Sequence, residues 1–337
     1  MKIQKIETNI KRNLYLYKTD NIDISPTSNV IENDVIYVNS DFKFQTLIGF
    51  GGAITESAGY SLSTVSEENY NKILDEYFLS DNLNYSLCRL PIGSSDFSLE
   101  SYSYSNQKDL SDFSIKRDMK YIVPTIKSAQ KRNKNIKFLS SPWSPPAFMK
   151  DNNNLYNGGK LLNQYKKTWT EYLIRYIKAY NKENINIDYM TIQNEPNASQ
   201  SWESCRYTAE EEADLLKNYL FPTFKQNNIK TKFLIWDHNK DAILERTINC
   251  CINNGALDYA AGIAFHWYTG SHFENLSTIN KLFPEKLLIH TEGCTGYSYF
   301  KPKDELFNAE LYASEIIGDL NNGVNGFIDW NIVLDYK

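Results

Sequence analysis

Residues 188–196 read Asp-Tyr-Met-Thr-Ile-Gln-Asn-Glu-Pro, and this stretch decides how the whole chain is interpreted. Its apolar first half favours a buried β-strand. Pro196 has no backbone N–H, so a strand that pairs on both sides ends before it. Asn194 and Glu195 are therefore expected at the C-terminal end of a strand, where α/β barrels place their chemistry. Taken alone, the stretch fits a polar turn after a strand equally well.

The chain around this stretch alternates between apolar runs and helix-length segments dotted with charge. Such alternation predicts a parallel sheet covered by helices. The expected strands are residues 46–50, 85–90, 136–139, 189–193, 232–236, 262–267, 286–290 and 326–330. The expected helices are residues 66–78, 115–132, 162–181, 209–227, 241–253, 273–282 and 308–322. Eight strands with a helix after each of the first seven predict an α/β fold, a (β/α)8 TIM barrel, over residues 44–337.

The first 43 residues have a different pattern, with short β-like runs separated by Asp, Asn, Pro and Ser. We expect residues 1–43 to form a short N-terminal β segment outside the barrel, with strands at residues 14–17 and 35–38. Because the sequence stops at Lys337, shortly after the eighth expected strand, we expect it to lack the last barrel helix.

The composition argues against two classes of binding partner. A net charge of -5 and a pI of about 5.6 argue against nucleic acid or an anionic membrane surface. There is no signal-like N-terminal stretch and no apolar run of membrane-spanning length, so the cytoplasm is the default location. Secretion stays open if further residues precede Met1. The sequence does not indicate an oligomeric state.

The cysteines and histidines do not predict a metal site. The five cysteines include no CxxC pair, and the four histidines show no metal-ligand spacing. We therefore expect reduced thiols and neither a metal nor another cofactor.

Two carboxylates are placed for joint chemistry. Glu195 follows the fourth expected strand and Glu292 follows the seventh, so both are expected at the mouth of one small ring. Cleavage of a glycosidic bond needs such a pair, because one acid must protonate the leaving oxygen while the other group meets the anomeric carbon. Asp237 and His238, after the fifth strand, are candidates for groups that support this pair.

Seven segments resemble glycoside hydrolase family 30, the glucosylceramidase-like family, and they run in the family's order. They are Gly49-Phe-Gly-Gly-Ala-Ile-Thr-Glu-Ser57, Cys88-Arg-Leu-Pro-Ile-Gly-Ser-Ser-Asp-Phe-Ser98, Ser140-Ser-Pro-Trp-Ser-Pro-Pro-Ala-Phe-Met-Lys150, Thr191-Ile-Gln-Asn-Glu-Pro196, Ala264-Phe-His-Trp-Tyr268, His290-Thr-Glu-Gly-Cys294 and Asp329-Trp-Asn331. The resemblance implies a retaining β-glycosidase. It also implies a β-sandwich, built in the family from N-terminal strands and a long C-terminal segment that this sequence does not contain.

The resemblance also implies a role for each matching residue. Glu195 would be the general acid/base and Glu292 the nucleophile. Arg89 would support the site with a fixed positive charge that favours an ionised Glu292. The residues expected to bind the sugar or line its site are Asp96, Trp143, Asn194, His266, Tyr268 and Trp330.

The resemblance implies double displacement with the two carboxyl groups about 5–5.5 Å apart. Glu195 must be protonated in the first step, so its pKa is expected to be raised while Glu292 is charged. The implied substrates are β-glucosides, either glucosylceramide-like or β-glucan oligosaccharides. Two alternatives stay open: an endo-β-1,6-glucanase or xylan-active relative with the same carboxylates, and a non-catalytic remnant that binds sugar.

Overall fold

The structure is a computed structural model that describes residues 2–23, 37–295 and 305–335. The chain divides into two compact units, Met1–Lys43 and Phe44–Lys337. In the first unit, β2 (Ile6–Asn9) and β3 (Leu14–Lys18) pair antiparallel, as do β1 (Lys2–Ile3) and β4 (Ile22–Asp23). The N-terminal β segment is thus present. Half of the strand expected at 35–38 lies outside the described residues, and Tyr37 and Val38 belong to no strand.

The second unit is a closed barrel of eight parallel strands in the order β10-β11-β12-β5-β6-β7-β8-β9. The strands are β5 (Gly49–Ala53), β6 (Leu87–Ile92), β7 (Lys137–Pro142), β8 (Tyr189–Thr191), β9 (Lys232–Asn239), β10 (Gly262–His266), β11 (Leu287–Glu292) and β12 (Gly326–Asn331). All eight expected strands are found, and the predicted (β/α)8 TIM barrel is confirmed.

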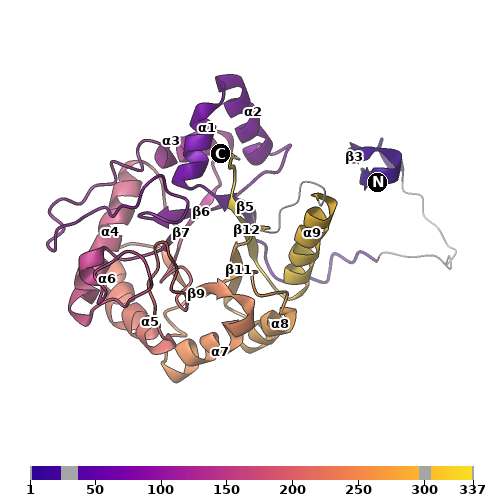
Figure 1. The fold of residues 1–337 in the computed structure, drawn as a ribbon. Coiled ribbons are helices and arrows are strands. Elements are labelled where there is room, and N and C mark those ends of the chain that lie inside the picture. Colours follow the sequence, from indigo (N-terminus) through magenta and orange to yellow (C-terminus); the bar gives the residue numbers. More distant parts are fainter. Residues whose placement is uncertain (1, 24–36, 296–304, 336–337) are drawn as a thin grey trace. The chain divides into compact units, whose positions relative to one another are not determined.

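Helices surround these strands, as the ring from α1 through α4 and α7 to α9 in Figure 1 shows. They are α1 (Glu56–Thr64), α2 (Glu67–Phe78), α3 (Ile122–Arg132), α4 (Lys166–Lys182), α5 (Ala209–Leu215), α6 (Phe221–Gln226), α7 (Ile243–Thr247), α8 (Phe273–Leu282) and α9 (Glu305–Asn321). Short 3₁₀ turns lie at Ile10–Arg12, Ala147–Met149, Asn163–Tyr165 and Lys240–Ala242, and π-helical turns at Leu216–Leu220 and Ile248–Asn253. None of the helices in the described ranges is both long and apolar enough to cross a bilayer.

The helix boundaries differ from the sequence prediction in several places, including the helix expected over 241–253, which is divided into a 3₁₀ turn, α7 and a π-helical turn. Helix α1 was not expected, because its sequence is rich in Ser, Thr and Gly; the Thr55 hydroxyl caps it by accepting from the Ala58 N–H. The helix expected from residue 115 begins only at Ile122. The helix expected over 209–227 is interrupted by a π-helical turn just before Pro222, which has no N–H to donate to the preceding turn.

A layer of apolar side chains lies inside the barrel. Seven strands contribute one buried residue each: Leu87, Leu139, Tyr189, Leu234, Ala264, Ile289 and Ile328. The eighth strand, β5, carries glycines instead. A Cβ on Gly51 would lie 1.7 Å from the carbonyl oxygen of Leu87, so the close approach of β5 to β6 requires glycine there. This layer closes the barrel beneath its mouth.

Three strands each carry one extra residue near their C-terminal ends. The register with the neighbouring strand shifts so that Asp237 in β9, Thr291 in β11 and Trp330 in β12 are left unpaired. Such β-bulges bend a strand and redirect its side chains, and they recur at barrel rims. In this barrel they bring extra polar and aromatic side chains to the mouth.

Candidate active site

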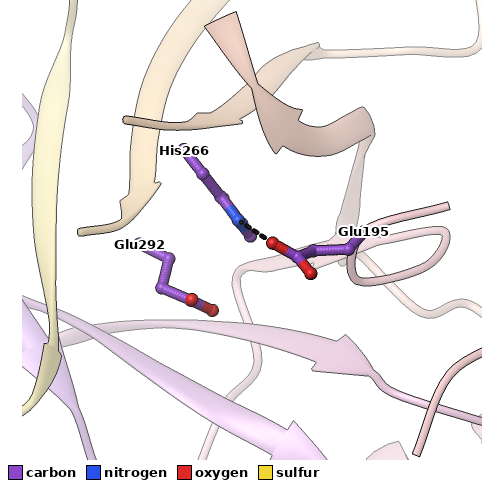
Figure 2. Close-up of side chains that lie close together, drawn as sticks. All are labelled: Glu195, His266 and Glu292. Carbon is purple, nitrogen blue, oxygen red and sulfur yellow. Dashed lines mark hydrogen bonds and ion pairs between the residues drawn. The ribbon is translucent and has the colours of Figure 1, made fainter. Parts of the chain in front are cut away.

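The carboxylates of Glu195 and Glu292 meet at the mouth of the barrel. Glu195 follows β8 with φ of 48°, and its N–H donates to the carbonyl oxygen of Asp237 at 2.9 Å. Glu292 is the last residue of β11. One oxygen of each carboxylate and a ring nitrogen of His266 all lie within 4.8 Å of one another. Figure 2 shows these three side chains converging from different strands and loops.

Arg89 lies fully buried beneath this pair. Its Nη1 donates to Glu292 at 2.5 Å, and its Nη2 donates to Asn194 at 2.8 Å and to Asp237 at 2.9 Å. Burial opposes the charge of the guanidinium, but the carboxylates of Asp237 and Glu292 outweigh it and raise the pKa of Arg89. The expected supporting cation is therefore in direct contact with the proposed nucleophile.

Asp237 is the centre of this buried network. It accepts hydrogen bonds from Arg89, from the hydroxyls of Ser141, Thr191 and Thr291 at 2.6–2.8 Å, and pairs with His266 Nε2 at 3.1 Å. Burial opposes its ionisation, but the Arg89 charge and these hydrogen bonds hold the pKa of Asp237 far below its usual range.

The backbone that places Asp237 is strained. Trp236 and Asp237 have φ of 77° and 59°, a conformation that costs a non-glycine residue of order 1–3 kcal/mol. The Trp236 N–H donates to the buried Glu212 at 2.8 Å, and Glu212 is paired with Arg246. Buried contacts behind the strand therefore hold the bulge that turns Asp237 into the barrel.

His266 links Asp237 to Glu195. Its Nδ1 lies 3.3 Å from Glu195 Oε1 while its Nε2 faces Asp237. Burial favours neutral imidazole, but the charge of Glu292 and the bonds to Asp237 and Glu195 raise the pKa of His266 to about 9. Burial raises the pKa of Glu195, but the hydrogen bond and the charge of His266 outweigh burial, so the pKa of Glu195 is lowered overall. The expected upward shift of the Glu195 pKa is wrong, because the sequence pattern does not reveal that the His266 ring lies beside this carboxylate.

A cavity of about 450 Å³ opens above the two carboxylates. The expected residues that line it are Asp96, Trp143, Asn194, Glu195, Tyr268, Glu292 and Trp330. Arg89 and His266 lie buried behind it. All nine residues to which the family resemblance gives a role thus lie together at one site.

The aromatic wall of this cavity is a stack of two indoles. The rings of Trp143 and Trp330 lie 5.4 Å apart at 23°, and Phe97 meets Trp330 edge-on. Arg89 lies 4.7 Å from the Trp143 ring. Both tryptophans are buried, so each presents only an edge or part of a face to the cavity.

Polar groups complete the cavity wall. The Tyr268 hydroxyl donates to Glu292 Oε1 at 2.9 Å. The Oδ1 of Asn194 accepts a hydrogen bond from Arg89, so the Nδ2 of Asn194 can donate to a ligand hydroxyl. Asp96 lies at the mouth of the cavity, where partial desolvation of its carboxyl and the charges of Glu292 and Glu195 raise its pKa.

Glu195, His266 and Glu292 form a cluster of possible metal ligands within the described ranges. Its charges do not fit a dication. Glu292 already bonds the Arg89 guanidinium, and the raised pKa of His266 keeps a proton on the ring that a metal would have to displace.

Sequence reasoning missed most of the network beneath the cavity. Ser141, Thr191 and Thr291 are polar residues inside apolar strands, and that interruption was the available signal. Asp237 was noted as a candidate, without its partners. Other cavity residues were also missed, among them Phe97, Gln200, Trp202 and Asn239. They lie on loops or at a strand end, where spacing alone does not predict direction.

Known proteins share this arrangement of sequence and fold. A Caenorhabditis elegans protein named as a glucosylceramidase is 36% identical over 323 residues, which cover 90% of this chain and 61% of the worm protein. The crystal structure of SrfJ from Salmonella typhimurium matches with a TM-score of 0.94 and 33% identity, over 100% of this chain and 76% of that one. The endo-β1,6-glucanase BT3312 matches with a TM-score of 0.84 and 30% identity, over 96% and 72%.

The chain spans about six tenths of the length of the curated relatives it matches. The description "Glycosyl hydrolase family 30 TIM-barrel domain" fits residues 47–337, nearly the whole barrel unit. With the closed barrel and the seven motifs at its mouth, this match shows that the chain belongs to glycosyl hydrolase family 30.

Proposed function

We propose that this chain is a retaining glycoside hydrolase that cleaves β-glucosidic bonds, with Glu195 as general acid/base and Glu292 as nucleophile. The supporting observation is the gap of at most 4.8 Å between one oxygen of each carboxylate. Retaining enzymes hold their carboxyl groups about 5–5.5 Å apart, whereas inverting enzymes leave about 6.5–9.5 Å for a water molecule. The gap therefore favours direct attack by Glu292.

In the first step, a Glu292 oxygen attacks the anomeric carbon as the bond to the leaving oxygen breaks. Tyr268 and Arg89 hold the Glu292 carboxylate by one hydrogen bond on each oxygen, which fixes its direction. The leaving oxygen takes a proton from Glu195. Because the pKa of Glu195 is lowered and that of His266 is raised, we infer that this pair carries one proton, held mainly on the His266 side, and that it reaches the leaving oxygen through Glu195.

In the second step, water attacks the glycosyl ester of Glu292 and gives its proton to Glu195. The ester bond breaks and returns Glu292 as a carboxylate. The sugar leaves with the configuration it had in the substrate, because the anomeric carbon has been inverted twice. Asn194, Asp96 and the Trp143–Trp330 wall would hold the sugar throughout.

Two substrate classes have support from relatives. Lipid-linked β-glucosides are suggested by the relatives named as glucosylceramidases, including the mouse lysosomal enzyme. β-Glucan chains are suggested by the endo-β1,6-glucanase that shares 30% identity and the same barrel. The matching xylanases are 20–22% identical and support the fold alone.

Replacement of each carboxylate tests the proposal on an aryl β-glucoside. Glu292→Gln should reduce turnover to background. Glu195→Ala should retain activity only toward an activated aryl glucoside, and azide should accelerate it and yield the β-glucosyl azide. Near-normal turnover by Glu292→Gln would overturn the assignment, and binding of sugar without turnover by the unmodified chain would favour the non-catalytic remnant.

A further inference from the structure

Four residues that line the cavity include two that contact the acid/base, Gln200 and His238. We call these four residues the leaving-group wall, formed by Gln200, Trp202, His238 and Asn239. Gln200 Nε2 lies 3.5 Å from Glu195 Oε2, and His238 Nε2 lies 3.9 Å from Glu195 Oε1. The group that leaves must lie on the side of the acid that protonates it. This wall is therefore where the second half of the substrate would be held.

Trp202 is unusual among the six tryptophans of the chain. The other five are buried, whereas Trp202 is 37% exposed. An exposed indole at a cavity rim carries a flat apolar face and a polar N–H, which suits contact with a ring that is itself partly polar. Trp202 thus stands out as a contact residue rather than a core residue.

The chain on the far side of Trp202 is held rigidly. Glu203 and Ser204 are buried next to it. Glu203 accepts from the Ser94 hydroxyl at 2.6 Å, and the Ser204 carbonyl accepts from the buried Lys150 Nζ at 2.6 Å. The loops that follow β6, β7 and β8 are locked together at this point. The backbone that carries Trp202 is therefore held in place before a ligand binds, which reduces the ordering that binding requires.

The rest of the leaving-group wall is polar. Burial lowers the pKa of His238 to about 4, so its ring is neutral and offers both a donor and an acceptor nitrogen. Its Nδ1 has no hydrogen-bond partner among the described residues. The Oδ1 of Asn239 accepts a hydrogen bond from the Tyr268 N–H. A lipid chain against this wall would leave the amides and the imidazole without hydrogen-bond partners, which is unfavourable for buried polar groups.

We propose that the leaving-group wall is a binding subsite for a second sugar ring, which stacks on Trp202 and bonds to Gln200, His238 and Asn239. This inference rests on the proposed hydrolase activity and specifies its substrate as a β-linked glucan oligosaccharide rather than a glucosylated lipid. Sugar rings have an apolar face for the indole and hydroxyls for the polar groups, so both kinds of surface are matched.

The test compares β-glucosyl fluoride, which has no second ring, with β-1,3-, β-1,4- and β-1,6-linked glucobioses and with glucosylceramide in detergent micelles. Trp202→Ala should lower kcat/KM for the preferred glucobiose roughly ten- to hundredfold relative to kcat/KM for the fluoride. Trp202→Phe should keep most of the ratio of kcat/KM for the glucobiose to kcat/KM for the fluoride. Trp202→Leu should lose it, because leucine is apolar but has no flat face.

Tyr60→Ala is the matched control, since Tyr60 is 40% exposed on α1 and does not line the cavity. This variant should change kcat/KM neither for the glucobiose nor for the fluoride. Trp202→Phe and Trp202→Leu stand in if Trp202→Ala does not fold, which a melting curve decides.

Three results would overturn the inference. The first is an unchanged ratio in folded Trp202→Ala. The second is that the chain cleaves glucosylceramide faster than every glucobiose and that Trp202→Leu still cleaves glucosylceramide at the original rate. The third is failure of the unmodified chain to hydrolyse the fluoride, which would show that the hydrolase proposal itself is wrong.

Discussion

Replacement of Asp237 by Asn changes one charge in a site that has no room for a change of shape. The two side chains are isosteric, and Asp237 is fully buried. The carboxylate accepts from four donors and pairs with His266, whereas an amide has one accepting oxygen and an NH2 group that must face donors. At least one hydrogen bond, to Arg89 or to His266, is lost.

The size of the effect follows from these bonds. Removal of one partner of a buried ion pair costs about 3–5 kcal/mol, and we expect the lower end because Arg89 keeps its bond to Glu292. For activity, a hydrogen bond to a charged group is worth about 1.5–3 kcal/mol. If its loss misplaces a carboxylate in the transition state, kcat/KM falls roughly 10- to 150-fold.

The assay is kcat/KM for a series of aryl β-glucosides with leaving groups of different acidity. Asp237 holds Arg89 against Glu292, so part of the loss should persist with the best leaving group. It also holds His266 against Glu195, so the loss should grow as the leaving group needs more proton transfer. A merely destabilised barrel would lower all rates by one factor.

Asp118→Asn is the matched control. Asp118 is equally buried and accepts from the hydroxyls of Tyr102, Tyr104 and Tyr180 at 2.6–2.8 Å, with no bond to either carboxylate. It should lower the Tm, and any loss of kcat/KM should be the same for every leaving group. Folded Asp237→Asn with more than half of the original kcat/KM, or a matching leaving-group pattern in Asp118→Asn, would refute the role of Asp237.

Three further predictions concern stability. The pKa of His266 is about 9 in the folded chain and about 6.5 when unfolded, so its stabilisation is complete below pH 6.5 and is lost as the pH rises through 9. The free energy of unfolding, measured in urea, should exceed that of His266→Gln by about 3 kcal/mol less at pH 10 than at pH 6. The same difference in free energy at both pH values would contradict the raised pKa of His266. Lys240→Met leaves the buried Glu315 and Asp319 of α9 without their cation, so the free energy of unfolding should fall by about 3–5 kcal/mol, and Glu315→Gln added to it should restore part of the loss. Gly51→Ala places a methyl group where the Leu87 carbonyl stands, so circular dichroism should show a chain that does not fold; a cooperative melt near the original Tm would contradict the close approach.

The barrel was predictable because its signal is repeated. Eight apolar runs separated by helix-length segments leave few other folds, and an error of two or three residues at one strand does not change the count. Local elements without that signal were missed. Helix α1 depends on the Thr55 cap more than on its own composition, and the π-helical turn before Pro222 is a backbone adjustment with no periodicity.

The two carboxylates were predictable because each follows a strand directly. Their electrostatics were not. The lowered pKa of Glu195 depends on His266, and the orientation of His266 depends on Asp237, which points inward only because β9 carries a bulge. A bulge changes which face a side chain occupies, and a period-two pattern cannot show it.

The charges in contact at the site balance through the proposed reaction. In the free enzyme, three carboxylates, Glu195, Glu292 and Asp237, face two cations, Arg89 and His266, for a net charge of one negative. The charge of Glu292 is one reason that the pKa of His266 is raised, so conversion of Glu292 to a neutral ester removes support for the imidazolium. If His266 has then given its proton to the leaving group through Glu195, the covalent intermediate again carries one negative charge. The site therefore opposes a positively charged anomeric carbon with the same net charge before and after the first step, and Glu195 is left ionised to accept a proton from water in the second.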